Sequence, residues 1–174
     1  MIALFSNKTY ARFATAAALV SLVLGCSTAM GGDGAGNQMG SGIAEARNGL
    51  SKTQSGVTAI TAGSRQTGIG NISDGMGMMG QGVGDVRQGM SMMSGNMMMS
   101  CADGGSDAVL VPMQQAMNEM QQGQSMLGVD AATSDDEGMA HVQNGMSMMK
   151  TALDHAQSSM NCMGHNGMMS GSMM

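Results

Sequence analysis

Residues 75–95 have the sequence GMGMMGQ GVGDVRQ GMSMMSG, three heptads that each begin with glycine. Heptads of the same form occupy residues 42–62 (GIAEARN GLSKTQS GVTAITA) and 138–151 (GMAHVQN GMSMMKT), and a shorter copy occupies residues 116–127. In each heptad an apolar residue follows the first position, and another small or apolar residue comes three positions later. Alternating spacings of three and four residues place apolar side chains on one face of an α-helix and do not fit a strand.

The apolar positions predict four helices, over residues 41–64, 74–100, 110–128 and 135–162. Short connections make neighbouring helices antiparallel, so we expect an all-α, up-down-up-down four-helix bundle over residues 41–162. The residues expected to line the core are Ile43, Ala46, Leu50, Val57, Ile60, Met76, Met79, Val83, Val86, Met90, Met93, Met97, Met113, Met117, Met120, Leu127, Met139, Val142, Met146, Met149, Leu153, Ala156 and Met160.

Glycine and proline set the expected helix boundaries. Gly70 and Asn71 favour a connection between the first two helices, and Pro112 is expected near the start of the third, where its missing N–H is not needed. The repeated glycines lie beside the apolar positions, where they would let two backbones approach closely, although each interior glycine costs about 1 kcal/mol relative to alanine. A disordered Gly/Met-rich segment is the alternative. The heptad phase is kept along the segment, which favours the helices.

The first 26 residues have the pattern of an export signal. Lys8 and Arg12 precede the uncharged apolar stretch FATAAALVSLVLG at residues 13–25, which is too short to span a bilayer core of about 30 Å. The stretch ends in Leu22-Val23-Leu24-Gly25-Cys26. This ending resembles the lipobox of bacterial lipoproteins, in which the cysteine becomes the lipidated first residue of the mature chain. An ordinary cleaved signal with a coincidental cysteine is the alternative.

The lipobox resemblance implies a signal peptide over residues 1–25, a lipid anchor on Cys26 and attachment to a membrane. Ser27 follows the cysteine in place of an aspartate, which implies the outer membrane, with the protein facing the periplasm. Residues 26–40 are rich in glycine and lack periodic apolar residues, so we expect a flexible tether that holds the bundle away from the membrane surface.

The charge and aromatic content exclude nucleic acid as a partner. Removing residues 1–25 lowers the number of Lys and Arg from 7 to 5 and leaves 12 acidic residues, so the mature chain carries a formal charge of −7. No aromatic residue follows Phe13. The mature chain therefore offers neither a basic surface for phosphates nor aromatic rings for base stacking.

Two cysteines remain after Cys26. Cys101 and Cys162 are each expected at the carboxyl end of a helix, and the second and fourth helices of an alternating bundle run parallel, so both cysteines should lie at the same end. A disulfide between them would stabilise the bundle by about 2–4 kcal/mol in an exported compartment. A pair of thiolate metal ligands is the alternative, although no closely spaced cysteine motif surrounds either residue.

The 26 methionines exceed what a core of this size requires. Met79, Met90, Met93, Met97, Met146, Met149 and Met160 are expected to replace leucine in the core. Others fall beside the apolar positions, namely Met78, Met92, Met99, Met126 and Met148. His141, Met148 and His155 recur at intervals of seven, which is either a metal-binding stripe or a solvated one. Since seven residues span about 10.5 Å, these three side chains cannot share one ion, and a site would need ligands from two helices.

The last residues, 163–174, are expected to form a flexible tail because their glycines and serines oppose a stable helix. The tail has no core to fill, yet it contains Met163, His165, Met168, Met169, Met173 and Met174. Thioether and imidazole groups suit Cu(I). The composition resembles that of Met-rich extracytoplasmic proteins that handle copper and silver, which implies sequestration of Cu(I) or Ag(I) through Met and His.

Two other functions compete with metal binding. Surface methionines are oxidised reversibly, so the protein could be an oxidant sink in the envelope, or it could be a structural bundle without a ligand. We expect no enzymatic activity, because no pair of acids or histidines has the spacing of a general acid and base.

Overall fold

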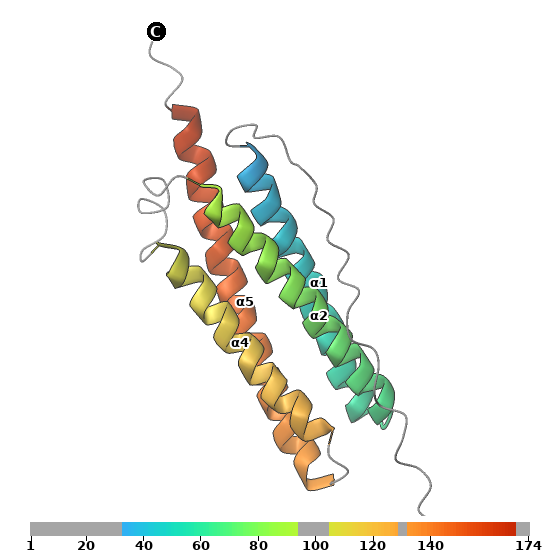
Figure 1. Ribbon diagram of the computed structural model, residues 1–174. Helices are drawn as coiled ribbons and strands as arrows, with labels where there is room; N and C mark the ends of the chain where they lie inside the picture. The colour runs from blue at the N-terminus through green and yellow to red at the C-terminus, as the bar shows by residue number, and fades with distance from the viewer. Residues whose placement is uncertain (1–32, 94–104, 129–131, 170–174) are drawn as a thin grey trace, which may run out of the picture.

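The computed structural model describes residues 33–93, 105–128 and 132–169. It contains four helices: α1 (Asp33–Thr61), α2 (Arg65–Ser91), α4 (Gly105–Leu127) and α5 (Ala132–Met169). Successive helices run in opposite directions and form an up-down four-helix bundle (Figure 1). The predicted fold class is therefore confirmed.

The heptads predicted the core correctly. Of the expected core residues, Leu50, Met93, Met117, Met139 and Met160 are half-buried against the core, and Met97 lies outside the described residues. All the others are buried. Sequence reasoning missed several buried side chains, namely Met39, Ile72, Val109 and Ala152.

Glycines bring the backbones of α1 and α2 together. A Cβ atom added to Gly42 would lie 2.5 Å from the carbonyl oxygen of Gly82, and one added to Gly56 would lie 2.6 Å from that of Gly68. Gly49 faces Gly75 between these two pairs. The pairs recur every seven residues along both helices, which confirms that the heptad glycine is the position of closest approach.

Glycines also bring the backbones of α4 and α5 together. A Cβ atom added to Gly138 would lie 2.9 Å from the carbonyl oxygen of Gly123, and one added to Gly145 would lie 2.7 Å from that of Ala116. The bundle thus consists of two closely packed hairpins, α1–α2 and α4–α5. Between the hairpins the contacts run from α1 to α5 and from α2 to α4, and they are less extensive.

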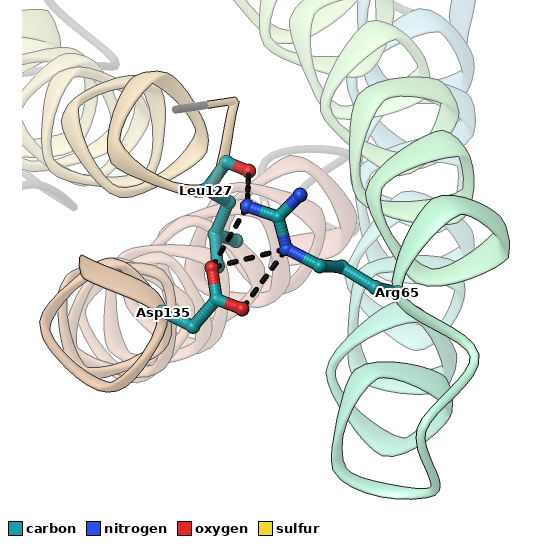
Figure 2. Close-up of polar contacts among 3 residues, drawn as sticks. All are labelled: Arg65, Leu127 and Asp135. Atoms are coloured by element: carbon teal, nitrogen blue, oxygen red, sulfur yellow. Dashed lines mark hydrogen bonds and ion pairs between the residues drawn. The ribbon is translucent and has the colours of Figure 1, made fainter. Parts of the chain in front are cut away.

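One arginine joins the ends of the two hairpins (Figure 2). Arg65, the first residue of α2, donates from Nη2 to the carbonyl oxygen of Leu127 at 2.6 Å. Its Nε donates to Asp135 Oδ2 at 2.9 Å and its Nη2 to Asp135 Oδ1 at 3.0 Å. The guanidinium lies at the carboxyl end of α4 and the carboxylate lies in the first turn of α5. Each charge therefore interacts favourably with the dipole of the helix end beside it.

The turn between α1 and α2 is shorter than predicted. Gly63 has a φ of 87°, its N–H donates to the carbonyl of Ile60, and the N–H of Ser64 donates to that of Ala59. These bonds end α1 in a Schellman motif. Helix α2 begins at Arg65, so the expected connection at Gly70 and Asn71 is wrong: both residues lie inside α2.

Two outer boundaries also differ from expectation. Helix α1 begins at Asp33, so part of the expected tether at 26–40 is helical, and the fully buried Met39 gives the first helix a methionine that the predicted boundary excluded. Helix α5 continues to Met169, and its last turns extend well past the amino end of α4 (Figure 1). The expectation that glycine and serine prevent a helix after residue 162 is therefore wrong for 163–169. The expected signal peptide, Cys26 and residues 170–174 lie outside the described residues.

Pro112 also lies deeper in its helix than predicted. Helix α4 begins at Gly105, which makes Pro112 its eighth residue. A proline in a helix interior has no N–H to donate to the carbonyl four residues earlier, here that of Ala108. The predicted start at residue 110 is five residues too late, because it placed the proline within the first turn, where a proline is best tolerated.

Candidate functional site

The predicted stripe of His141, Met148 and His155 lies on α5, and its members have different surroundings. Met148 is half-buried and packs against the edge of the core. His155 is exposed, and His141 is half-buried. Their heptad spacing keeps them about 10.5 Å apart along the helix axis, so the stripe does not gather its members around one point.

A groove between α4 and α5 contains two of the three predicted residues. It has a volume of about 350 Å³, and Met148 and His155 line it together with Pro112 of α4. The remaining lining residues are Ala108, Ser147, Thr151 and Ala152. Because Pro112 cannot donate to the carbonyl of Ala108, this groove also lies beside a peptide oxygen without its usual helical donor. Residues with thioether, imidazole and hydroxyl groups therefore line one open and mostly apolar depression, with Met148 and His155 about two helical turns apart.

His141 belongs to a separate polar cluster. Its Nδ1 lies 2.8 Å from Glu119 Oε1, and Asn144 Nδ2 donates to the same oxygen at 3.0 Å. The hydrogen bond from Asn144, followed by that from His141, holds the pKa of Glu119 below its usual value. A carboxylate against Nδ1 favours the tautomer with a proton there, which leaves Nε2 of the neutral ring as a lone-pair donor.

Sequence reasoning did not find Glu119 or Asn144 as partners of His141. The information lay in the glycine repeats, because setting Gly123 opposite Gly138 fixes the register of α4 against α5. In that register position 119 faces position 141. The heptads were used to define helix faces and not to pair the helices, so this contact was missed.

Most of the described thioethers serve the core. The buried methionines are Met39, Met76, Met79, Met90, Met113, Met120, Met146 and Met149. The prediction that Met79, Met90, Met146 and Met149 fill the core is confirmed. Of the surplus methionines, Met78 and Met126 are half-buried, Met92 is 50% exposed, and Met99 lies outside the described residues.

The described residues contain no group of three or more His, Cys, Asp or Glu side chains that could hold a metal ion. The other predicted ligands, Met163, His165, Met168, Met169, Met173 and Met174, have side chains outside what the structure describes.

Of the three cysteines, the structure describes only Cys162. Cys162 is half-buried in α5 and disulfide-bonded, which removes it as a free thiolate ligand. The residue that completes this bond lies outside the described part of the chain, as do Cys26 and Cys101.

Among the helices that the structure describes, none combines the length and the hydropathy that a transmembrane span requires. The sequence matches no protein-family model, and no curated protein or solved structure is significantly similar to it.

Proposed function

We propose that this protein is a non-catalytic, lipid-anchored envelope protein that binds Cu(I) or Ag(I) through thioether and imidazole groups. The observation that carries the proposal is that Met148 and His155 both line one solvent-accessible groove, about 10.5 Å apart along α5, so that each offers a separate donor to an ion. Thioether sulfur and imidazole nitrogen are soft or borderline donors that suit Cu(I), and a thioether needs no deprotonation to bind.

The hydrogen bond between His141 and Glu119 supports the same chemistry. Metal-binding imidazoles commonly donate their second N–H to a carboxylate, which fixes the ring and raises its basicity. His141 has this partner at 2.8 Å. It is a further imidazole on the same helix that is prepared to bind an ion through Nε2.

The end of α5 supplies a closer set of ligand positions. Because the helix continues to Met169, positions 165, 168 and 169 are three and four residues apart on one helix and share a face. We propose that His165, Met168 and Met169, whose side chains lie outside what the structure describes, form a second binding region. We include Met163, Met173 and Met174 in the same proposed binding region.

A Cu(I) titration against a chromophoric chelator, without oxygen, tests the proposal. The first variant is Met148→Leu/His155→Gln, and the second is His165→Gln/Met168→Leu/Met169→Leu, which keeps the helix length. Each variant should lose its share of the bound copper. Met92→Leu, an exposed methionine outside both sets, is the matched control and should bind like the wild type.

Negligible Cu(I) uptake by the wild type would overturn metal binding. Peroxide treatment followed by mass spectrometry then separates the two remaining functions. An oxidant sink would show rapid oxidation that follows exposure, with Met92 ahead of the buried methionines and no dependence on His155. A structural bundle would show slow oxidation throughout.

The anchor and the disulfide are separate parts of the proposal. We propose that Cys26 carries the lipid that holds the protein to the outer membrane, facing the periplasm, and that Cys101 is the partner of Cys162. Cys26→Ser should release the protein from the membrane fraction. A peptide map without reduction should contain the Cys101–Cys162 pair, and a fragment that joins Cys162 to Cys26 would contradict both parts.

A further inference from the structure

A second groove lies between α2 and α4 and contains none of the proposed metal ligands. Its volume is about 430 Å³, within the usual range for small-ligand sites. The lining residues are Gly80, Val83, Gly84 and Arg87 of α2 and Gln114, Met117, Asn118 and Gln121 of α4. We call it the amide groove.

One wall of the amide groove is a row of primary amides. Gln114, Asn118 and Gln121 are four and three residues apart, so they lie on one face of α4. None of the three makes a hydrogen bond to another residue within the described part of the chain. Each amide can therefore offer two N–H donors and one carbonyl oxygen to a ligand.

The other wall carries a cation without a carboxylate partner. Among the described residues, Arg47, Lys52 and Arg65 are paired with carboxylates, whereas Arg87 has no ion pair there. Because α2 and α4 run antiparallel, Arg87 lies toward the Gln114 end of the groove and Gly80 toward the Gln121 end. A guanidinium at one end favours a ligand with a terminal anionic group, above all a planar carboxylate.

Two glycines leave the α2 side of the amide groove without side chains at positions 80 and 84. A Cβ atom added to Gly84 would meet nothing within 4 Å, and one added to Gly80 would meet only the Met117 methyl group at 3.8 Å. The floor between the walls is apolar, with Val83 buried and Met117 half-buried. The groove thus offers space above small apolar contacts, with polar groups along one side and at one end.

We propose that the amide groove binds the carboxyl-terminal segment of a peptide, with the terminal carboxylate at Arg87 and the peptide groups along the amide row. A primary amide can bond to both polar atoms of a peptide group, since its NH2 group donates to the peptide C=O and its carbonyl oxygen accepts from the peptide N–H. The amides are separated by about 6.0 and 4.5 Å of helix rise, shorter than the roughly 6.8 Å between alternate residues of an extended chain, so the flexible Gln114 and Gln121 side chains must spread apart to follow the peptide. This proposal does not depend on metal binding.

The test is a titration of the ¹⁵N-labelled full chain, in a nonionic detergent, with acetyl-trialanine that has a free carboxylate. Amide resonances of the residues that line the groove should shift, and the C-terminally amidated peptide should bind about tenfold more weakly because it lacks the charge-assisted bonds. Arg87→Gln should reduce affinity for the free acid by a similar factor and leave affinity for the amidated peptide unchanged.

Two leucine variants separate the groove from the helix that carries it. Gly84→Leu fills the groove and should abolish the shifts. Gly77→Leu is the matched control, because a Cβ there also meets nothing within 4 Å and Gly77 does not line the groove. It should bind like the wild type.

A ten-residue peptide that ends in the same three alanines identifies the source of the ligand. Equal affinity assigns the groove to the ends of protein chains, and failure of the longer peptide assigns it to short free peptides. The proposal is overturned if both leucine variants bind equally, if the amidated peptide binds as well as the acid, or if glucuronate shifts the same resonances at lower concentration than the peptide. The last result would assign the groove to acidic sugars.

Discussion

Gly49 in α1 and Gly75 in α2 contact each other reciprocally: a Cβ atom on either residue would lie 2.5 Å from the carbonyl oxygen of the other. Real Cβ atoms do not approach an oxygen so closely, and the obstacle is backbone. The hairpin can therefore keep its spacing only while both positions lack a side chain. This contact explains why the sequence retains glycines in helix interiors despite their cost.

Gly49→Ala should destabilise the protein by about 3 kcal/mol, because the two helices must move apart to accept the methyl group. Gly77→Ala is the control on the neighbouring helix, where a Cβ meets nothing within 4 Å. It should stabilise the protein by about 0.5–1 kcal/mol through helix propensity. Urea unfolding of both variants measures the difference, and equal effects would contradict the importance of the contact.

Arg65→Ala should lower the free energy of unfolding by about 2 kcal/mol, since it removes charge-assisted hydrogen bonds to Asp135 and Leu127. Arg47→Ala is the matched control. It breaks an ion pair with Asp154 whose two side chains are 46% and 58% exposed, and such pairs contribute about 0.5 kcal/mol. If chemical denaturation shows the same loss for both variants, Arg65 does not join the hairpins in the way proposed.

Pro112→Ala should stabilise the protein by about 1–2 kcal/mol. Alanine restores an N–H that can bond to the carbonyl of Ala108, and proline costs about 3 kcal/mol relative to alanine in a helix interior. Part of the gain is offset because the unfolded alanine chain is more flexible. Thermal unfolding measures the change, and a lower melting temperature would show that the pyrrolidine ring is needed for packing at the groove.

The lowered pKa of Glu119 predicts a pH dependence of stability. Its folded pKa lies below the reference value of 4.5 because Asn144 and His141 stabilise the carboxylate. The stabilising contribution is therefore complete above pH 4.5 and is lost as the pH falls through the folded pKa. Glu119→Gln should reduce the loss of stability between about pH 5.5 and pH 3. Urea midpoints across this range measure it, with Glu137→Gln, exposed on the same hairpin, as the control.

The heptads contain enough information for the fold and the core, because they fix which face of each helix is apolar. They do not fix the helix ends, because glycine has two structural roles in this chain: it ends a helix at some positions and allows two helices to pack closely at others. Gly63 ends a helix with a positive φ of 87°, whereas Gly68 lies in a helix against Gly56. Turn propensity predicts a turn around Gly70, whereas the contact of Gly68 with Gly56 and the burial of Ile72 keep this stretch helical.

The candidate sites were only partly predictable for a related reason. His141, Met148 and His155 were found from their spacing on one helix, which sequence displays directly. The partner Glu119, the neighbouring Pro112 and the whole amide groove depend on which residues of two different helices face each other. That information requires the relative register of the helices, which the paired glycines define only once they are recognised as contacts.

The seven-residue period of the glycine contacts also sets how each hairpin can change in length. Inserting one heptad into both α1 and α2 would add one more glycine pair and lengthen the hairpin by about 10.5 Å, while every existing pair keeps its partner. An insertion that is not a whole number of heptads would place side chains against backbone. The hairpin is therefore extensible in whole heptads, and duplication of a 21-nucleotide unit in each arm is the simplest genetic change that preserves it.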